Sequence, residues 1–142
     1  MLRGKSTMRV ILIAVLTVFL MSCTKEAPPV TLELLDGNVL QQKDWKGKWV
    51  YINYWAEWCK PCIEEIPYLN ALDQKYPQVT VLGVNYDGAS GEALEQQRQT
   101  LGVAFASLEE DPAEQLGKPR PVVLPTTFIV NPDGKLVAEL IG

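Results

Sequence analysis

Two cysteines separated by two residues lie between a strand-like and a helix-like segment, and this arrangement constrains the chain more than any other feature. Residues 59–62 read Cys-Lys-Pro-Cys. The residues before them, 49–54, are aromatic and β-branched, as in a buried strand, and residues 63–72 carry apolar side chains at helical spacing. Cys59 is therefore expected at a helix N-terminus, where exposed backbone N–H groups and the helix dipole favour the thiolate.

The spacing of the pair predicts thiol–disulfide exchange. Cys62 would lie one helical turn after Cys59 on the same face, within reach to close a disulfide. Pro61 suits the first turn, where its missing N–H costs little. Lys60 adds a cation, which we expect to be solvated and to tune the thiolate. A Cys-x-x-Cys pair in this strand-to-helix context is a strong indication of redox chemistry.

Two other uses of such a pair remain open but fit less well. A structural zinc site needs about four ligands, mostly Cys and His. The chain has no His, and its third cysteine, Cys23, lies far upstream. The absence of His also argues against Cys-His nucleophilic catalysis. A purely structural disulfide across two residues would strain the local geometry. We therefore expect a redox dithiol with no metal and no dissociable cofactor.

The N-terminus indicates the compartment. Three basic residues precede an uncharged apolar run at residues 10–20, which suits a signal-peptide core and is too short to span a membrane. The run leads into Leu-Met-Ser-Cys23, which resembles the lipobox of bacterial lipoproteins. We predict a lipoprotein signal peptide at 1–22 and a lipid-anchored tether at 23–29, starting at a lipidated Cys23. An uncleaved anchor is the alternative. Either form places the domain on the far side of the cytoplasmic membrane, where disulfides persist.

The remaining residues form an acidic chain of single-domain size. Residues 1–22 hold three of the 13 basic residues and none of the 17 acidic ones, so the rest carries a net charge of −7. Nucleic-acid binding would call for a basic patch, and we expect no nucleic-acid partner. The part after the tether, 30–142, is long enough for one modest α/β domain.

Hydrophobic patterning predicts strands that alternate with helices. The expected elements are a hairpin around the Asp36-Gly37-Asn38 turn, strands at 49–54, 79–86, 126–130 and 136–141, helices at 59–76 and 92–101, and at most a short helix at 112–116. This order implies a sheet with parallel pairs, completed by an antiparallel hairpin.

Four segments together resemble the TlpA/ResA branch of the thioredoxin superfamily, the membrane-tethered disulfide reductases of bacterial envelopes. They are Asn53 to Cys62, Glu65 with Pro67, Gly83-Val84-Asn85, and Leu124 to Phe128. The resemblance covers 30–142 and implies a thioredoxin fold, an α/β fold with a central mixed sheet flanked by helices and an N-terminal hairpin. The family usually adds a helix after the last strand. This sequence stops at Gly142, so we expect the C-terminal helix to be missing, and a fragment is the simpler explanation.

The resemblance also implies roles for residues around the dithiol. Pro125 should be the superfamily's cis-proline beside Cys59 and Cys62, and Leu124 should offer backbone groups to a substrate strand. Thioredoxin has a buried Asp where this chain has Asn53, which cannot accept a proton. The family places a functional acid at the position of Glu65, which would inherit the role. The alternative is an ordinary surface glutamate.

Three further features have weaker support. Trp58 could form part of a substrate platform or could simply pack, and packing is favoured for Trp55. The segment 118–121, Lys-Pro-Arg-Pro, would lie near the rim of the groove. It could select an acidic partner, although a solvated Pro-rich loop explains it more simply.

Together these features predict a lipid-anchored, monomeric thiol–disulfide oxidoreductase of the bacterial envelope that acts as a reductase. The resemblance implies that it reduces disulfides of envelope proteins, including the Cys-x-x-Cys-His haem site of apocytochrome c, and is recharged by a membrane thiol electron donor. A thiol oxidant or isomerase of the same fold is the main alternative, because the motif does not set the direction. A thiol peroxidase fits less well, because residues 53–58 lack the Pro and Thr of that family's pattern. A binding module with a vestigial dithiol is the third possibility.

Overall fold

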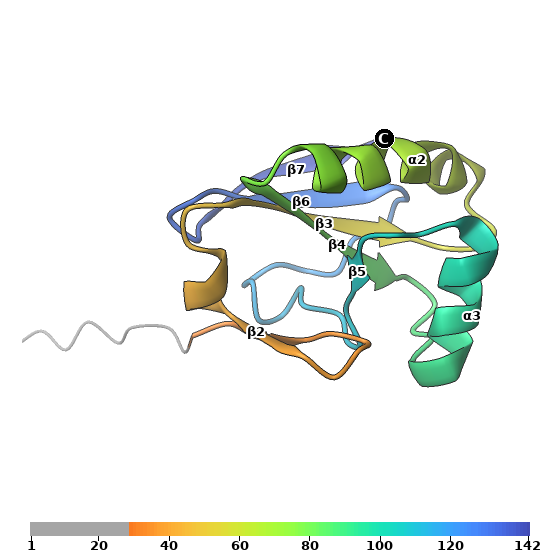
Figure 1. Cartoon of the computed structure of the whole chain (residues 1–142), viewed down its shortest axis with the longest axis horizontal. Helices are drawn as coiled ribbons and strands as arrows, with labels where there is room; N and C mark the ends of the chain where they lie inside the picture. Colours follow the sequence, from red (N-terminus) through yellow and green to blue (C-terminus); the bar gives the residue numbers. More distant parts are fainter. Residues whose placement is uncertain (1–28) are drawn as a thin grey trace, which may run out of the picture.

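The computed structural model describes residues 29–142, which contain two helices, one 3-10 turn and seven strands. The elements, in chain order, are β1 (Thr31–Glu33), β2 (Val39–Gln41), η1 (Gln42–Trp45), β3 (Trp49–Trp55), α2 (Lys60–Lys75), β4 (Val79–Asn85), α3 (Gly91–Leu101), β5 (Ala106–Ser107), β6 (Thr126–Val130) and β7 (Leu136–Ile141). Figure 1 shows them along the chain.

A mixed sheet of five strands forms the centre, in the order β5-β4-β3-β6-β7. Neighbours β3, β4 and β5 pair in parallel, whereas β6 pairs antiparallel with both β3 and β7. The first two strands form a separate antiparallel hairpin. Because β3 lies in the middle, both of its edges are paired with neighbouring strands.

Alternation along β3 assigns its side chains to two cores, since successive residues of a strand point to opposite faces. Val50, Ile52 and Tyr54 belong to a cluster shared with Leu32 and Trp45 from the hairpin side. The other cluster contains Trp55, with Ile66 from α2, Leu94 from α3, and both cysteines. The dithiol is thus built into the core on the helical face.

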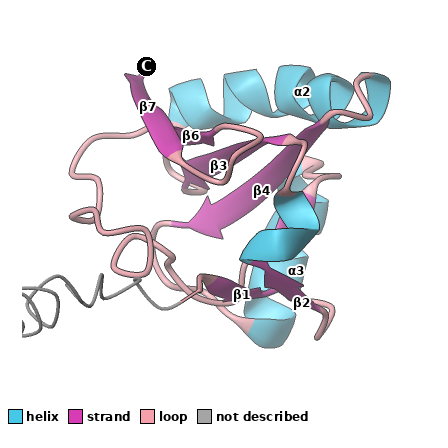
Figure 2. Cartoon of the chain, turned by 90° about the vertical axis from the view of Figure 1, so that its left-hand side faces the viewer, coloured by secondary structure: helices cyan, strands magenta, loops and turns pink. Residues whose placement is uncertain are grey.

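Both helices cover the same face of the sheet. The crossover from β3 to β4 and that from β4 to β5 step in the same direction, and right-handed connections then place α2 and α3 on one side. Figures 1 and 2 show α2 on one side of the sheet and the β1–β2 hairpin on the other.

The predicted thioredoxin fold is confirmed, including the N-terminal hairpin and the four strands expected in the sheet. The sequence did not predict β5, a strand of only two residues. Residues 113–117 form turns, with the Leu116 N–H bonded to the Pro112 carbonyl, so the short helix considered there is absent. Helix α2 continues past Pro67 to Lys75.

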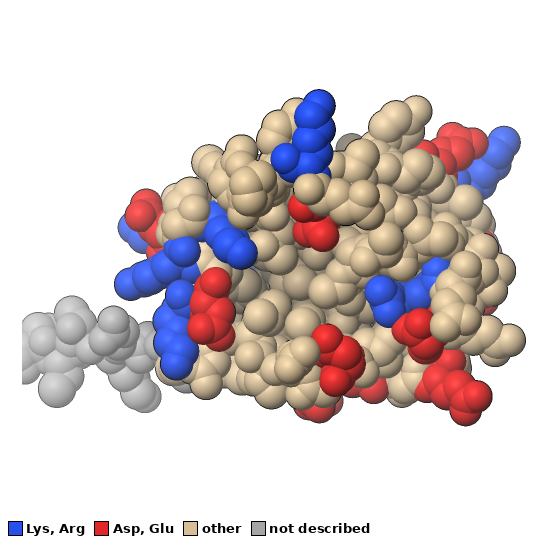
Figure 3. All heavy atoms as spheres, in the orientation of Figure 1, with Lys and Arg blue, Asp and Glu red and all other residues tan. Residues whose placement is uncertain are grey.

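Charged side chains of both signs are interspersed around the edge of the face seen in Figure 3. Its middle is largely uncharged. Within residues 29–142, no helix has the length and apolar character needed to cross a membrane.

Candidate active site

The two cysteines form a disulfide at the start of α2. Cys59 is the N-cap residue, and its Sγ accepts a hydrogen bond from the Cys62 backbone N–H at 3.3 Å. Their Cα atoms are 5.2 Å apart. Cys59 is 4% exposed and Cys62 is fully buried. Both cysteines are therefore buried, and Cys59 is the slightly more exposed of the two.

Local sequence determines this placement. β3 ends at Trp55, and the Cys59 N–H donates to the Ala56 carbonyl at 3.1 Å, which closes a tight turn into the helix. Pro61 falls in the first helical turn, as predicted. Lys60 is exposed, and its Nζ lies 3.8 Å from the carboxylate of Glu64, so most of its charge faces water. The Cys62 N–H of this first turn is bonded to the sulfur of Cys59, at the positive end of the helix dipole.

Glu65 lies half-buried on α2, one turn after Cys62. Asn53 Nδ2 donates to Glu65 Oε1 at 2.7 Å and to Thr127 Oγ1 at 3.0 Å. Burial raises the pKa of Glu65, and the bond from Asn53 opposes part of that rise. A carboxyl with a raised pKa, on the helix that carries the dithiol, is better suited to take up and return a proton than an ordinary surface glutamate. Glu64, by contrast, points its side chain into solvent.

The loop before β6 reaches the same region. The Leu124–Pro125 peptide bond is cis, in agreement with the resemblance. Leu124 packs against the cluster that contains both cysteines. A groove of about 300 Å³ has Pro125 and Glu65 among its lining residues. The structure therefore places the dithiol and Glu65 on the N-terminal half of α2, with Leu124 packed against the cysteine cluster and Pro125 lining one groove with Glu65.

The two tryptophans near the dithiol differ in burial. Trp58 is 65% exposed, and its Nε1 donates to Asp87 Oδ2 at 2.9 Å. Its ring meets the ring of Tyr86 edge to face, with centroids 6.4 Å apart. Trp55 is fully buried, so it packs in the core, as was favoured. An exposed but tethered indole directly before Cys59 gives Trp58 the geometry of a contact surface.

Two parts of the site were not foreseen. Asn53 cannot accept the proton, yet its amide nitrogen holds Glu65, the group that can, and only the packing of α2 over β3 reveals this bond. Arg120 is exposed, as a solvated loop implies, but its guanidinium also lies 4.1 Å above the Tyr86 ring and pairs with Asp111. No run or period in the sequence signals either contact.

Two predicted features need separate mention. Cys23, the predicted lipidation site, and the signal peptide at 1–22 lie outside the described residues. Among residues 29–142 there is no group of three or more His, Cys, Asp or Glu side chains placed to hold a metal ion.

The fold and the dithiol define a class, the thioredoxin-like thiol–disulfide oxidoreductases. Residues 23–139 match the AhpC/TSA family. A thiol-disulfide oxidoreductase ResA from Bacillus thuringiensis (strain Al Hakam) is 35% identical over 123 residues, which are 86% of this chain and 71% of that protein. The chain belongs to the AhpC/TSA family and, within it, to the ResA-type thiol–disulfide oxidoreductases.

Solved structures agree with this assignment. The thioredoxin domain of a thiol-disulfide oxidoreductase from Bacteroides vulgatus is 29% identical, with a TM-score of 0.63 over 82% of this chain and 86% of that one. A Chlorobium tepidum protein described as a thiol:disulfide interchange protein DsbE is 27% identical, with a TM-score of 0.64 over 82% of this chain and 83% of that one.

Proposed function

We propose that this thiol–disulfide oxidoreductase works as a reductase of protein disulfides in the bacterial envelope. The observation that supports the proposal best is the half-buried Glu65 on the helix that carries the dithiol, in which Cys59 is less deeply buried than Cys62. An attacking sulfur at the helix N-terminus, a more deeply buried resolving sulfur and a proton acceptor are the parts that disulfide exchange needs.

The exchange has two balanced steps. The Cys59 thiolate attacks one sulfur of the substrate disulfide, forming a mixed disulfide and releasing the other substrate sulfur as a thiolate, which takes up a proton. Cys62 then loses its proton and attacks Cys59, which releases the second substrate thiol and leaves the 59–62 disulfide. Glu65 accepts the proton from Cys62. A membrane thiol donor reverses the sequence and is itself oxidised.

The proposed substrates are envelope proteins whose disulfides must open before maturation, with the Cys-x-x-Cys-His haem site of apocytochrome c as one class. The resemblance to the TlpA/ResA branch supports this choice. The proposed location is the outer side of the cytoplasmic membrane or the periplasm, through a lipid on Cys23, and the apolar segment at 10–20 supports it.

The direction can be measured through the dithiol's equilibrium with reduced and oxidised glutathione. A reductase should hold its disulfide at a potential well below that of glutathione, on the order of −270 mV or lower, whereas an oxidant lies nearer −120 mV. The same protein should reduce the disulfides of insulin when dithiothreitol supplies electrons. A strongly oxidising potential would favour the oxidant or isomerase and end the reductase proposal.

A further inference from the structure

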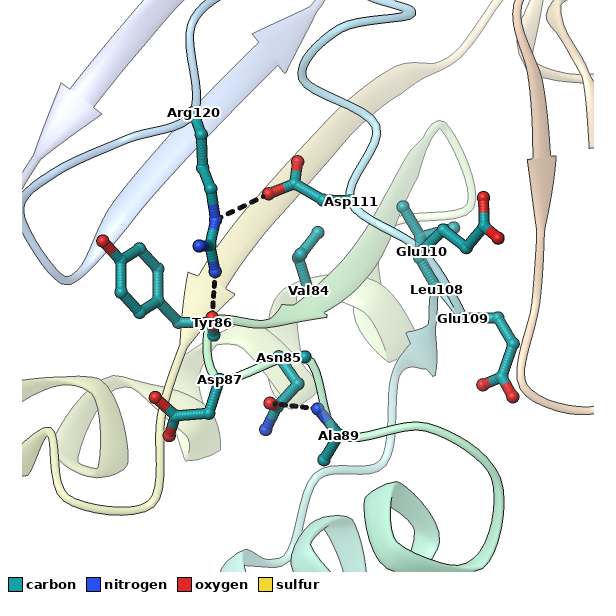
Figure 4. A pocket seen from close by; sticks show the side chains of 11 residues that line it. Val84, Asn85, Tyr86, Asp87, Ala89, Leu108, Glu109, Glu110, Asp111 and Arg120 are labelled. Carbon is teal, nitrogen blue, oxygen red and sulfur yellow. Dashed lines mark hydrogen bonds and ion pairs between the residues drawn. The ribbon is translucent and has the colours of Figure 1, made fainter.

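Arg120 makes three contacts that join two loops beside the dithiol. Its guanidinium stacks 4.1 Å above the ring of Tyr86, and one Nη donates to the Tyr86 carbonyl oxygen. Its Nε lies 3.0 Å from Asp111 Oδ2. Figure 4 shows Arg120 between Tyr86 and Asp111 at the edge of a pocket of about 410 Å³. A planar guanidinium can make all three contacts at once, and a lysine ammonium cannot.

The contacts of Arg120 with Tyr86 and Asp111, here called the Arg120 clamp, connect two parts of the candidate site. Tyr86 follows β4, its N–H donates to the Trp55 carbonyl at 2.8 Å, and its ring supports Trp58 edge to face. On the other side, Arg120 lies four residues before Leu124, in the loop that ends at the cis peptide bond. The clamp therefore joins the surface that carries Trp58 to the loop that carries Leu124.

Asp111 connects the clamp to the core on the hairpin side of the sheet. Asp111 Oδ1 accepts hydrogen bonds from the Tyr54 hydroxyl at 2.7 Å and from the Ala113 N–H at 2.9 Å. Tyr54 is fully buried in β3, and its ring packs edge to face on Phe128. Tyr54 and Ala113 thus hold Asp111 in place independently of its ion pair with the half-exposed Arg120. The pairing links the loop to the rigid centre of the sheet.

We infer that Arg120 is a positioning residue, which sets the separation between Trp58 and the backbone of Leu124, the two groups proposed to contact a substrate polypeptide. The inference rests on the proposed function, because it assumes that a polypeptide disulfide binds between Trp58 and Leu124. Arg120 does not touch either cysteine through any of its contacts. Its loss should therefore affect the capture of polypeptides and leave the chemistry of the dithiol unchanged.

The test compares a polypeptide disulfide with a small one. Arg120→Ala should raise KM for insulin on the order of tenfold or more, as expected when a binding group is displaced. The value of kcat should change little. Reduction of the small reagent 5,5′-dithiobis(2-nitrobenzoate) and the pH profile of Cys59 alkylation should match wild type. Arg120→Lys keeps the positive charge but loses the planar set of N–H donors. Its KM for insulin should therefore lie between those of wild type and Arg120→Ala.

Lys118→Ala is the matched control, because it removes a basic residue from the same loop, where Nζ lies 3.7 Å from Glu139. It should behave as wild type with both substrates. Equal losses on insulin and on the small disulfide in Arg120→Ala, or no loss on either, would overturn the inference.

A second measurement needs no polypeptide substrate. The indole N–H resonance of Trp58, assigned by its absence in Trp58→Phe, should shift and exchange faster with solvent in Arg120→Ala than in Lys118→Ala. An unchanged resonance would overturn the inference on its own. If wild type failed to reduce insulin while this resonance still responded, the proposed function would fail and the positioning role would stand.

Discussion

Asn53 Nδ2 donates to Glu65 Oε1 at 2.7 Å and so fixes the carboxyl of α2 against the central strand of the sheet. The oxygen of the same side-chain amide, Asn53 Oδ1, is buried without a hydrogen-bond partner among the described residues. The amide nitrogen makes both of its hydrogen bonds, to Glu65 and to Thr127, so Asn53 holds the carboxyl from a fully buried position.

Removing the charge of Glu65 should slow disulfide reduction. Glu65→Gln retains an oxygen that can accept from Asn53 and loses the ability to move a proton. We expect a decrease in rate on the order of 10²-fold, as is usual for a lost acid–base group. The pH dependence of Cys59 alkylation should shift as well, measured between about pH 5 and 9. Glu64→Gln should show neither change, and wild-type behaviour in both variants would make Glu65 a structural charge.

The raised pKa of Glu65 predicts a pH dependence of stability. A carboxyl whose pKa is higher in the folded state stabilises that state most below the unfolded pKa, near the ordinary value of 4.5, and loses this contribution as the pH rises through the folded pKa. Glu65→Gln lacks that loss. In urea unfolding of the oxidised proteins, the variant should therefore gain stability relative to wild type between acidic and neutral pH. A constant difference at every pH would contradict the assignment.

The burial difference between the cysteines predicts which one reacts. In the reduced protein, an alkylating reagent at neutral pH should label Cys59 well before Cys62, because Cys62 is the more deeply buried of the two. Cys62→Ser should accumulate a mixed disulfide with substrate, detected on a non-reducing gel, and Cys59→Ser should accumulate little. Faster labelling of Cys62 would reverse the proposed roles.

Gly83 should tolerate no side chain. A Cβ there would lie 2.9 Å from both Phe105 Cε2 and Trp55 Nε1, inside the core on the helical face. Overpacking of this kind costs about 1–3 kcal/mol, so Gly83→Ala should lower the free energy of unfolding by that amount in urea titrations. Phe105→Leu removes one of the two clashing groups. In the double variant the costs should be less than additive, and strict additivity would place the strain elsewhere.

The anchor can be tested independently of the chemistry. If Cys23 carries a lipid, metabolic labelling with a fatty-acid analogue should mark wild type and leave Cys23→Ser unmarked. Equal labelling of both would exclude lipidation at this residue. A domain that starts near Thr24 should keep its redox activity, because the tether supplies location only.

Prediction from sequence succeeded where the signal was local. The strand before Cys59 and the helix after it have clear periods, and the capping position of Cys59 follows directly from their junction. The two-residue strand β5 is too short to carry a period. The contact of Arg120 with Tyr86 joins residues 34 apart through irregular loops, so nothing in the local sequence indicates it. The Asn53–Glu65 bond was hidden for a different reason, since it needs the register of β3 under α2.

Adjacent residues of β3 make contacts on opposite faces of the sheet, and this limits the insertions and deletions that the strand can tolerate. Asn53 reaches Glu65 on the helical face, while Tyr54 reaches Asp111 on the other. Inserting or deleting one residue between Trp49 and Asn53 would exchange the faces of the residues before the change relative to those after it. Either the core or the site would then be lost. Length variation among descendants of this chain should therefore be absent from β3 and confined to the loops.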